Sequence, residues 1–243
     1  MNRPAIAFAC LAALTLPAAA HDIKSARKPT IPPHFDILSA DAKTKGKVVT
    51  FNMTVAGTVG AEKPKKTGQV PGSQVYAYVW PTTLDPEVAG FTKGSGILAL
   101  AVTAHPDFDD TPLHDENGDG DPNNDGANWH SHWVVLAKDP ACGPAGLKVR
   151  DISPGEDLEV PPTAPNFPLL LDSPGYSPLM KGSKLSVNGT LKNNQTANGA
   201  GFDAVTAKMQ VNKDGKAPLL CVTEVMDIAS GKLDLSGRIH EEK

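Results

Sequence analysis

The sequence has few cysteines, few aromatic residues and, after residue 20, no long apolar segment. Three of its 243 residues are cysteine and 5% are aromatic. The shortage of long apolar segments argues against a transmembrane helix in residues 21–243, and the lack of heptad repeats excludes a coiled coil. The formal net charge of −4 argues against nucleic acid as a partner, because a phosphate backbone attracts clustered lysine and arginine.

Lysine and arginine are also absent from residues 94–137. This stretch of 44 residues holds eight acidic residues and four of the seven histidines. A bound cation is the simplest compensation for so much negative charge beside so many imidazoles, because unpaired charges are costly to hold together. Metal binding is therefore the first functional hypothesis, with a metal ion as the expected partner.

Residues 1–20 have the features of a secretory signal peptide. One positive charge precedes an apolar run over residues 5–16, and small residues follow it at the expected cleavage site. The run is too short to span a bilayer, and Cys10 within it lies in a poor context for lipidation. We expect cleavage after Ala20, a periplasmic or secreted location, and a mature chain of residues 21–243.

Two cysteines follow the expected leader, Cys142 and Cys221. In an oxidising compartment an isolated pair usually forms a disulfide. The bond would close a loop of about 80 residues and contribute about 3–5 kcal/mol in the chain-entropy model. We predict this disulfide, and two unpaired buried thiols are the alternative.

Alternating apolar and polar residues predict β-strands and very little helix. Val49, Phe51 and Met53 share one face of the segment 47–55, as in a half-buried strand. The expected strands cover residues 47–55, 74–80, 96–105, 128–137, 147–152, 184–191, 204–211 and 219–226. Short strands separated by turn signals predict an all-β fold, namely a single antiparallel β-sandwich of the immunoglobulin-like or jelly-roll-like kind with long loops.

Three segments do not read as core strands. Residues 21–40 are expected to form an extended N-terminal arm, and the Pro-rich residues 154–178 a long loop over the sheet. Leu169–Leu171, an isolated apolar group in that loop, is expected to cover a hydrophobic edge. The tail from Gly237 is polar and expected to fray. Residues 21–243 are thus expected to form one domain.

The strand expected at 128–137 contains the pattern H-x-H. His130 and His132 are two residues apart, so on a strand both imidazoles project from the same face and can share one ion. His105 ends the strand expected at 96–105. If these strands are neighbours, His105 lies beside the other two, and three imidazoles suit zinc or copper. The alternative is a pair of hydrogen-bonded sheet histidines.

The 22 residues between the two histidine strands offer further ligands. His114, Asp107, Asp109 and Asp110 are candidates for a fourth ligand or for an outer layer of support. A second arrangement uses His21, which cleavage after Ala20 would make the N-terminal residue. Its amine and ring would then hold copper as in a histidine brace.

Residues 115–126 form a separate signal within the same excursion. Oxygen-bearing side chains at positions 1, 3 and 5 and a glycine at position 6 resemble an EF-hand or thrombospondin type 3 calcium loop over these 12 residues. Gly126 stands at position 12, where the EF-hand has a bidentate Glu, and Asp125 is the expected substitute. The resemblance implies a Ca²⁺ site with the ligands Asp115, Asn117, Asp119, Asp121 and Asp125. A surface turn without an ion is the alternative.

Sequence motifs for catalysis are missing. The chain contains no G-x-S-x-G, no glycine-rich phosphate loop and no H-E-x-x-H. Ser131 lies between two histidines but points to the other strand face, which argues against a nucleophile–base pair. Asp109, Asp110 or Glu116 could serve as a base beside a metal-bound water.

Three hypotheses follow from these patterns. The preferred one is an exported protein that binds Cu or Zn for metal handling or sensing. The second is a metal-dependent enzyme that uses the same histidines, with an open ligand position in a cleft. The third is a structural or surface module that calcium stabilises. The first and second therefore differ in whether a cleft reaches the ion.

Overall fold

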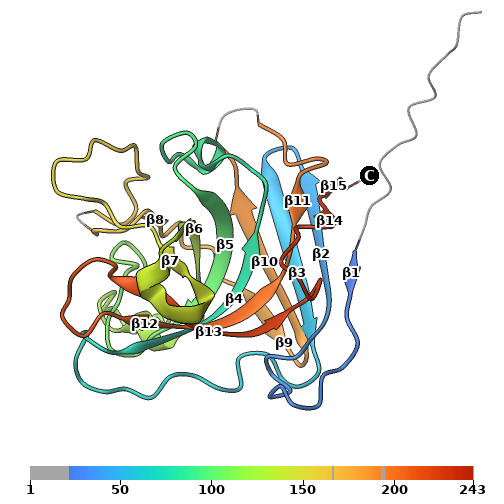
Figure 1. Cartoon of the computed structure of the whole chain (residues 1–243), viewed down its shortest axis with the longest axis horizontal. Coiled ribbons are helices and arrows are strands. Elements are labelled where there is room, and N and C mark those ends of the chain that lie inside the picture. The colour runs from blue at the N-terminus through green and yellow to red at the C-terminus, as the bar shows by residue number, and fades with distance from the viewer. Residues whose placement is uncertain (1–21, 166, 193–194, 243) are drawn as a thin grey trace, which may run out of the picture.

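The computed structural model describes residues 22–165, 167–192 and 195–242. The expected signal peptide over residues 1–20 and the expected N-terminal His21 lie outside this part of the chain. Figure 1 shows two β-sheets side by side, one of them closed on itself.

The larger sheet closes into a six-stranded barrel. Its strands follow the order β5-β4-β12-β13-β7-β6, and β6 pairs again with β5 to complete the ring, while β8 adds to β6. The strands are β4 (Gln74–Pro81), β5 (Ile97–Ala104), β6 (His130–Lys138), β7 (Leu147–Val149), β8 (Leu171–Asp172), β12 (Val205–Val211) and β13 (Leu220–Ile228). Neighbouring strands of the ring are antiparallel.

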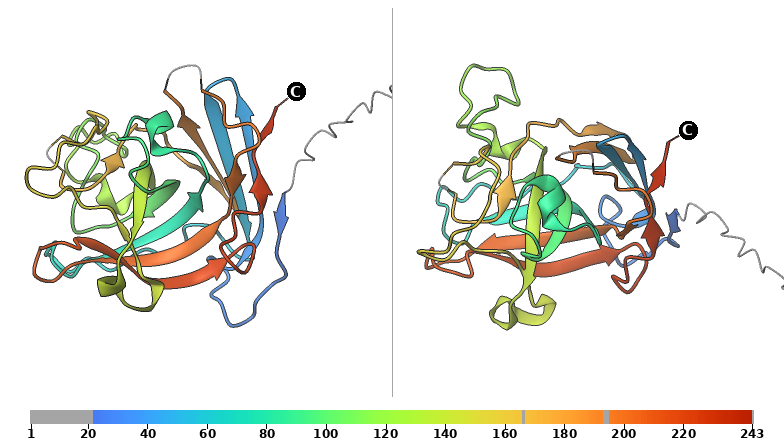
Figure 2. Two further views of the ribbon diagram at one scale, coloured as in Figure 1. Left: turned by 45° about the horizontal axis from the view of Figure 1, so that its top comes forward. Right: turned by 90° about the horizontal axis from the view of Figure 1, so that it is seen from above.

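A second sheet packs against one wall of the barrel (Figure 2). Its order is β1-β2-β3-β10-β9, and β15 pairs with β2 in parallel. These strands are β1 (Ile23–Lys24), β2 (Ile37–Lys45), β3 (Val48–Val55), β9 (Leu179–Lys181), β10 (Lys184–Thr190) and β15 (His240–Glu241). The smaller elements are β11 (Gly201–Phe202), β14 (Gly237–Arg238), and the 3-10 turns η1 (Pro86–Ala89), η2 (Asp125–Ala127) and η3 (Pro140–Ala145).

Strands β4, β5 and β6 form the wall between two interiors. Because side chains alternate along a strand, each of these strands contributes to both. On β4, Tyr78 and Trp80 pack toward the second sheet, whereas Ala77 and Val79 face into the barrel. The wall therefore places its largest residues on one side and its small residues on the other.

The interior between the sheets is packed with aromatic rings. The ring centroid of Phe51 on β3 lies 5.8 Å from that of Trp80 and 6.1 Å from that of Trp133. Gly189 on β10 makes room for Trp133, since a Cβ at this position would come within 2.4 Å of the indole. This interior holds the second sheet against the barrel wall.

All eight strands expected from the sequence are present, and the all-β prediction is confirmed. The structure differs from the predicted sandwich because the pairing of β5 with β6 closes one sheet on itself. No hydrophobic pattern distinguishes a closed sheet from an open one, since both need one buried face. The residues expected to form an arm contain β1 and the start of β2.

The predicted disulfide between Cys142 and Cys221 is confirmed. The two Cα atoms are 5.2 Å apart, and the bond ties η3 to β13. In the long Pro-rich loop, Leu169 and Leu171 reach the barrel interior, and Leu170 packs between the sheets. The same loop contributes β8, so it forms part of the barrel edge in addition to covering it.

Candidate metal centre

Two neighbouring strands bring the three predicted histidines together. His130 and His132 lie on β6 with their side chains toward the barrel interior, in register with Thr103 and Ala101 of β5. His105 directly follows β5, at the end where β6 begins. The expected adjacency of these strands is therefore present, and the three imidazoles meet at one end of the barrel.

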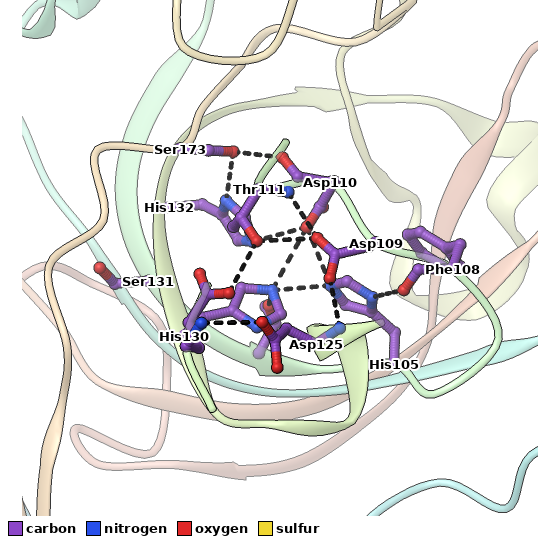
Figure 3. Close-up of polar contacts among 12 residues, drawn as sticks. His105, Phe108, Asp109, Asp110, Thr111, Asp125, His130, Ser131, His132 and Ser173 are labelled. Carbon is purple, nitrogen blue, oxygen red and sulfur yellow. Dashed lines mark hydrogen bonds and ion pairs between the residues drawn. The ribbon is translucent and has the colours of Figure 1, made fainter. Parts of the chain in front are cut away.

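Asp110 completes this group from the loop between the strands. The loop folds back because the backbone N–H of His105 donates to the carbonyl of Gly126, at 2.6 Å. Gly126 allows this close approach, since a Cβ there would lie 1.8 Å from the carbonyl oxygen of Phe108. The return of the loop turns the Asp110 carboxylate toward the three rings, as Figure 3 shows.

The four ligand atoms lie within 4.8 Å of one another, and four of their six separations are close to those that a tetrahedral metal requires. Asp110 Oδ1 is 3.2 Å from His105 Nε2 and 3.3 Å from Nε2 of both His130 and His132. The Nε2 atoms of His105 and His130 are 2.9 Å apart. Zinc bonds of about 2.0–2.1 Å place the corners of a tetrahedron about 3.3 Å apart. We name these four residues the His3Asp cluster.

Each imidazole is held by an oxygen at its outer nitrogen. His105 Nδ1 donates to the carbonyl of Phe108 at 2.9 Å, and His130 Nδ1 donates to the carbonyl of Asn128 at 2.8 Å. A carbonyl accepts only, so both rings carry their proton on Nδ1. Their Nε2 atoms consequently point lone pairs at the centre of the cluster, the arrangement typical of metal-binding histidines.

Ser173 plays the same part for the third ring. Its hydroxyl donates to the backbone carbonyl of Asp110 at 2.6 Å, so its oxygen accepts from His132 Nδ1 at 3.2 Å. Ser173 follows β8 in the Pro-rich loop. One hydroxyl thus fixes the His132 tautomer and anchors the loop that carries Asp110.

The centre of the cluster holds four acceptors and almost no donor. Asp110 Oδ1 and His132 Nε2 are buried without a hydrogen-bond partner. Among the described residues, the Thr103 hydroxyl, 3.3 Å from His130 Nε2, is the one outside donor that reaches these four atoms. Unpaired acceptors at this separation repel each other in a buried site unless a cation lies between them.

The buried charges of the cluster shift the pKa values of three of its members. Burial raises the pKa of the Asp110 carboxyl, but the His105 and His132 rings outweigh it and hold this pKa well below its ordinary value. Burial lowers the pKa of His130 to about 4, aided by the neighbouring His105 and His132. Burial also opposes protonation of His105, but the Asp110 carboxylate leaves its pKa raised. Asp110 therefore stays charged and His130 stays neutral, which are the forms that bind metal.

A second group of ligand-type side chains adjoins the first. Asp109, Glu116 and Asp125 present carboxylate oxygens within 4.8 Å of one another. Asp109 accepts from the backbone N–H of Asp125 at 2.7 Å, and Asp125 from that of Glu116 at 2.8 Å. Glu116 Oε1 is buried without a partner, and burial raises the pKa of this carboxyl. Oxygen-only sets suit a hard cation such as Ca²⁺.

The other residues of the expected calcium loop turn onto their own backbone. Asp115 accepts from the N–H groups of Gly118 and Gly120, at 2.6 and 2.8 Å. Asp119 and Asp121 likewise accept from the N–H two residues ahead, and Asn117 Oδ1 accepts from Asp119. Of the five residues expected to bind calcium, Asp125 alone joins the carboxylate group around Asp109.

Two other predicted ligands lie outside the His3Asp cluster. Asp107 accepts from the backbone N–H groups of Thr67 and Gly68, at 2.7 and 2.6 Å, and so anchors a neighbouring loop. His114 is half-buried against Gly175.

Asp110 was one of four candidate ligands that the sequence offered in this loop. The role of Ser173 had no signal in the sequence, because it depends on how the Pro-rich loop, distant in sequence, folds back against the cluster.

The barrel contains a cavity of about 460 Å³ that reaches the His3Asp cluster. His105, Asp110 and His132 border it, and His130 does not. Its remaining lining is mainly apolar, from residues such as Val79, Ala101, Val134, Leu171, Ala207 and Met209. Side chains usually fill the interior of a small barrel, but alanines and valines are too short to fill this one.

Comparison with protein-family models, with curated proteins and with solved structures gave no match. In the described part of the chain, no helix is long and apolar enough to cross a membrane. We therefore infer the function from the geometry of the cluster and of the cavity beside it.

Proposed function

We propose that this chain is an exported metalloprotein that holds one Zn²⁺ through His105, Asp110, His130 and His132. The observation that carries the proposal is the convergence of four buried ligand atoms, with the three imidazole nitrogens 3.2–3.3 Å from Asp110 Oδ1. Zinc fits better than copper, because Cu(II) prefers a square-planar or tetragonal set and Cu(I) prefers sulfur ligands. Export follows from the expected leader and agrees with the disulfide.

The burial of the cluster favours a resident ion over one that is handed on. The side chains of the four residues are 1–5% exposed. A delivery site must exchange its ion with a partner, which needs ligands at the surface. An ion at this depth is suited to support the barrel end and to bind or sense a ligand from the cavity.

A metal-dependent enzyme is the second candidate, and the cavity at the cluster is the observation in its favour. Hydrolysis at a metal usually needs a base beside the bound water. Among the described residues that border the cavity, the histidines and the one carboxylate are themselves the proposed ligands, and the other charged groups are Lys138 and Lys232. This lining favours ligand binding over hydrolysis.

We also propose a calcium site in the loop between β5 and β6, with ligands that differ from those expected over residues 115–126. The carboxylates of Asp109, Glu116 and Asp125 form the proposed site, with the buried free oxygen of Glu116 as the supporting observation. Calcium there would fix the loop that delivers Asp110. Calorimetric titration with Ca²⁺ should detect one site that Glu116→Gln weakens, and absence of heat would overturn the prediction.

Elemental analysis of protein purified without chelators tests the zinc proposal. We expect about one zinc per chain, lost when His130 and His132 are both changed to Asn. His34→Asn is the matched control, because the His34 ring pairs with Glu62 at the surface instead of joining the cluster and its loss should leave zinc in place. Calcium alone, no ion, or equal zinc in all variants would refute the proposal.

A further inference from the structure

The barrel cavity is too large and too apolar to be a packing defect. Protein interiors are close-packed and rarely contain voids much larger than a water molecule, yet this cavity measures about 460 Å³. That volume lies in the range of pockets for small organic ligands. Apolar cavities stay dry and bind apolar molecules. The cavity therefore suits a hydrocarbon-like group.

The polar groups of the cavity are confined to its ends. Thr103, His105, Asp110 and His132 border it at the cluster. Lys138, at the opposite end of β6, and Lys232 are exposed lysines that also border it. Between them the wall offers no hydrogen-bonding side chain among the described residues. Sugars and nucleotides would leave their polar groups unpaired there, which excludes them as ligands.

The cluster presents one of its faces to the cavity. Three of its four residues border the cavity, and they form one face of the tetrahedron. A fifth ligand can approach zinc through such a face, since zinc sites expand to five ligands. Zn²⁺ with three neutral imidazoles and the Asp110 carboxylate carries a net charge of +1. A buried net charge is costly, so an anionic donor is favoured over a neutral or cationic one.

We propose that the barrel binds a single-chain carboxylic acid, with its hydrocarbon tail in the lumen and its carboxylate on the metal. This inference depends on the proposed zinc site, because the metal supplies the charge that selects the headgroup. The tail replaces empty space beside Ala101, Val134 and Ala207, and the carboxylate neutralises the buried cluster. Binding breaks and forms no covalent bond in the chain.

Calorimetric titration of the zinc-loaded protein with three probes of equal tail length tests the proposal. Decanoate should bind at least tenfold more tightly than decanol, and decyltrimethylammonium should bind more weakly still. Decanoate should also bind at least tenfold more weakly to the chelator-treated protein. In the cobalt-substituted protein, decanoate should shift the visible absorption of the metal, because the carboxylate enters its coordination sphere.

Filling the lumen provides the variant test. The double substitution Ala101→Leu and Ala207→Leu should reduce decanoate affinity at least tenfold. Zinc content and melting temperature should remain at the wild-type values. Ala42→Leu is the matched control, since Ala42 is fully buried in the packed interior between the sheets. It should lower the melting temperature and leave decanoate affinity unchanged in the folded fraction.

The outcomes separate this inference from the zinc proposal. If elemental analysis finds no zinc in the wild-type protein, the zinc site itself is refuted. Zinc retained with no decanoate binding, or with equal binding of decanoate and decanol, refutes the carboxylate inference alone. Binding that survives metal removal but disappears in Lys138→Ala with Lys232→Ala would place the carboxylate at the other end, and would also overturn it.

Discussion

The two sides of the wall formed by β4, β5 and β6 differ in what fills them. Toward the second sheet, β4 and β6 present Tyr78, Trp80 and Trp133, which belong to the buried core between the sheets, where both tryptophans pack near Phe51. Toward the barrel, β4, β5 and β6 present Val79, Ala101, Val134 and His132, which border a cavity. One set of strands thus stabilises the fold on one face and builds a site on the other.

This difference shows how alternation along a strand separates stability from function. On β6, His132 belongs to the metal cluster, whereas Trp133, the next residue, packs in the core between the sheets. A site on a strand is held more precisely than one on a loop, because the ladder fixes the backbone on both sides. The packed face therefore supplies the rigidity that the open face needs.

Metal removal should have the largest effect, and it should be confined to the barrel end. An ion present at about a thousand times its Kd stabilises the folded chain by about 4 kcal/mol. Chelation should therefore lower the free energy of unfolding by about 4 kcal/mol. Amide exchange should become faster in the residues around His105 and His130, with little change in β2, β3 and β10. Uniform loss of protection across both sheets would contradict this separation.

Two leucines compare the faces directly. Leu100 of β5 is fully buried between the sheets, whereas Leu171 of β8 borders the cavity. Leu→Ala in a packed core costs about 3–5 kcal/mol, and the cost rises with the new empty volume. The loss of unfolding free energy should be about 5 kcal/mol for Leu100→Ala and about 2 kcal/mol for Leu171→Ala. Urea unfolding measures both losses. Equal costs would mean that the cavity side is as tightly packed as the other.

The acid sensitivity of the metal-free protein should come from the barrel face. The pKa of His130 is lowered to about 4 from an ordinary value of 6.5, so below pH 6.5 the unfolded chain binds a proton that the folded chain refuses. Stability should then fall by about 3 kcal/mol as pH drops from 6.5 to 4. Urea unfolding with a chelator present measures it.

His105 should produce the opposite slope above that range. Its pKa is raised, so its contribution is fully present below pH 6.5 and is lost as pH rises through the folded pKa. Stability of the metal-free protein should therefore be highest near pH 6.5. His130→Asn should remove the acid slope and leave the slope above pH 6.5. An unchanged acid slope in that variant would assign it to other groups.

Much of this arrangement could be predicted from the sequence because it follows from local rules. Alternation identified the strands, and the two-residue step of His130 and His132 required both rings on one face. The closure of the sheet could not be predicted, since it depends on pairing between strands rather than on either strand alone. Nor could Asp110 be chosen over Asp109, because neighbouring loop residues point in directions that only the fold of the loop determines.

The smallest effect, and the sharpest one, concerns Ser173. Its hydroxyl bridges His132 Nδ1 and the Asp110 carbonyl, so it links the wall strand to the loop. Ser173→Ala should leave the packed face untouched and lower zinc affinity about 10–100-fold, as loss of an outer hydrogen bond to a metal ligand usually does. Competition with a chromogenic chelator measures the affinity.

Ser131 supplies the control for this last prediction. Its side chain lies on the opposite face of β6 and donates to the carbonyl of Tyr176 at 2.6 Å, so its hydroxyl bonds the same Pro-rich loop and none of the cluster side chains. Ser131→Ala should loosen that loop to a similar degree and leave zinc affinity within about twofold, since the Ser131 side chain projects from the other face of the strand. If both variants weaken zinc equally, Ser173 acts by anchoring the loop. If only Ser173→Ala does, it acts by orienting His132, which is the outcome we expect.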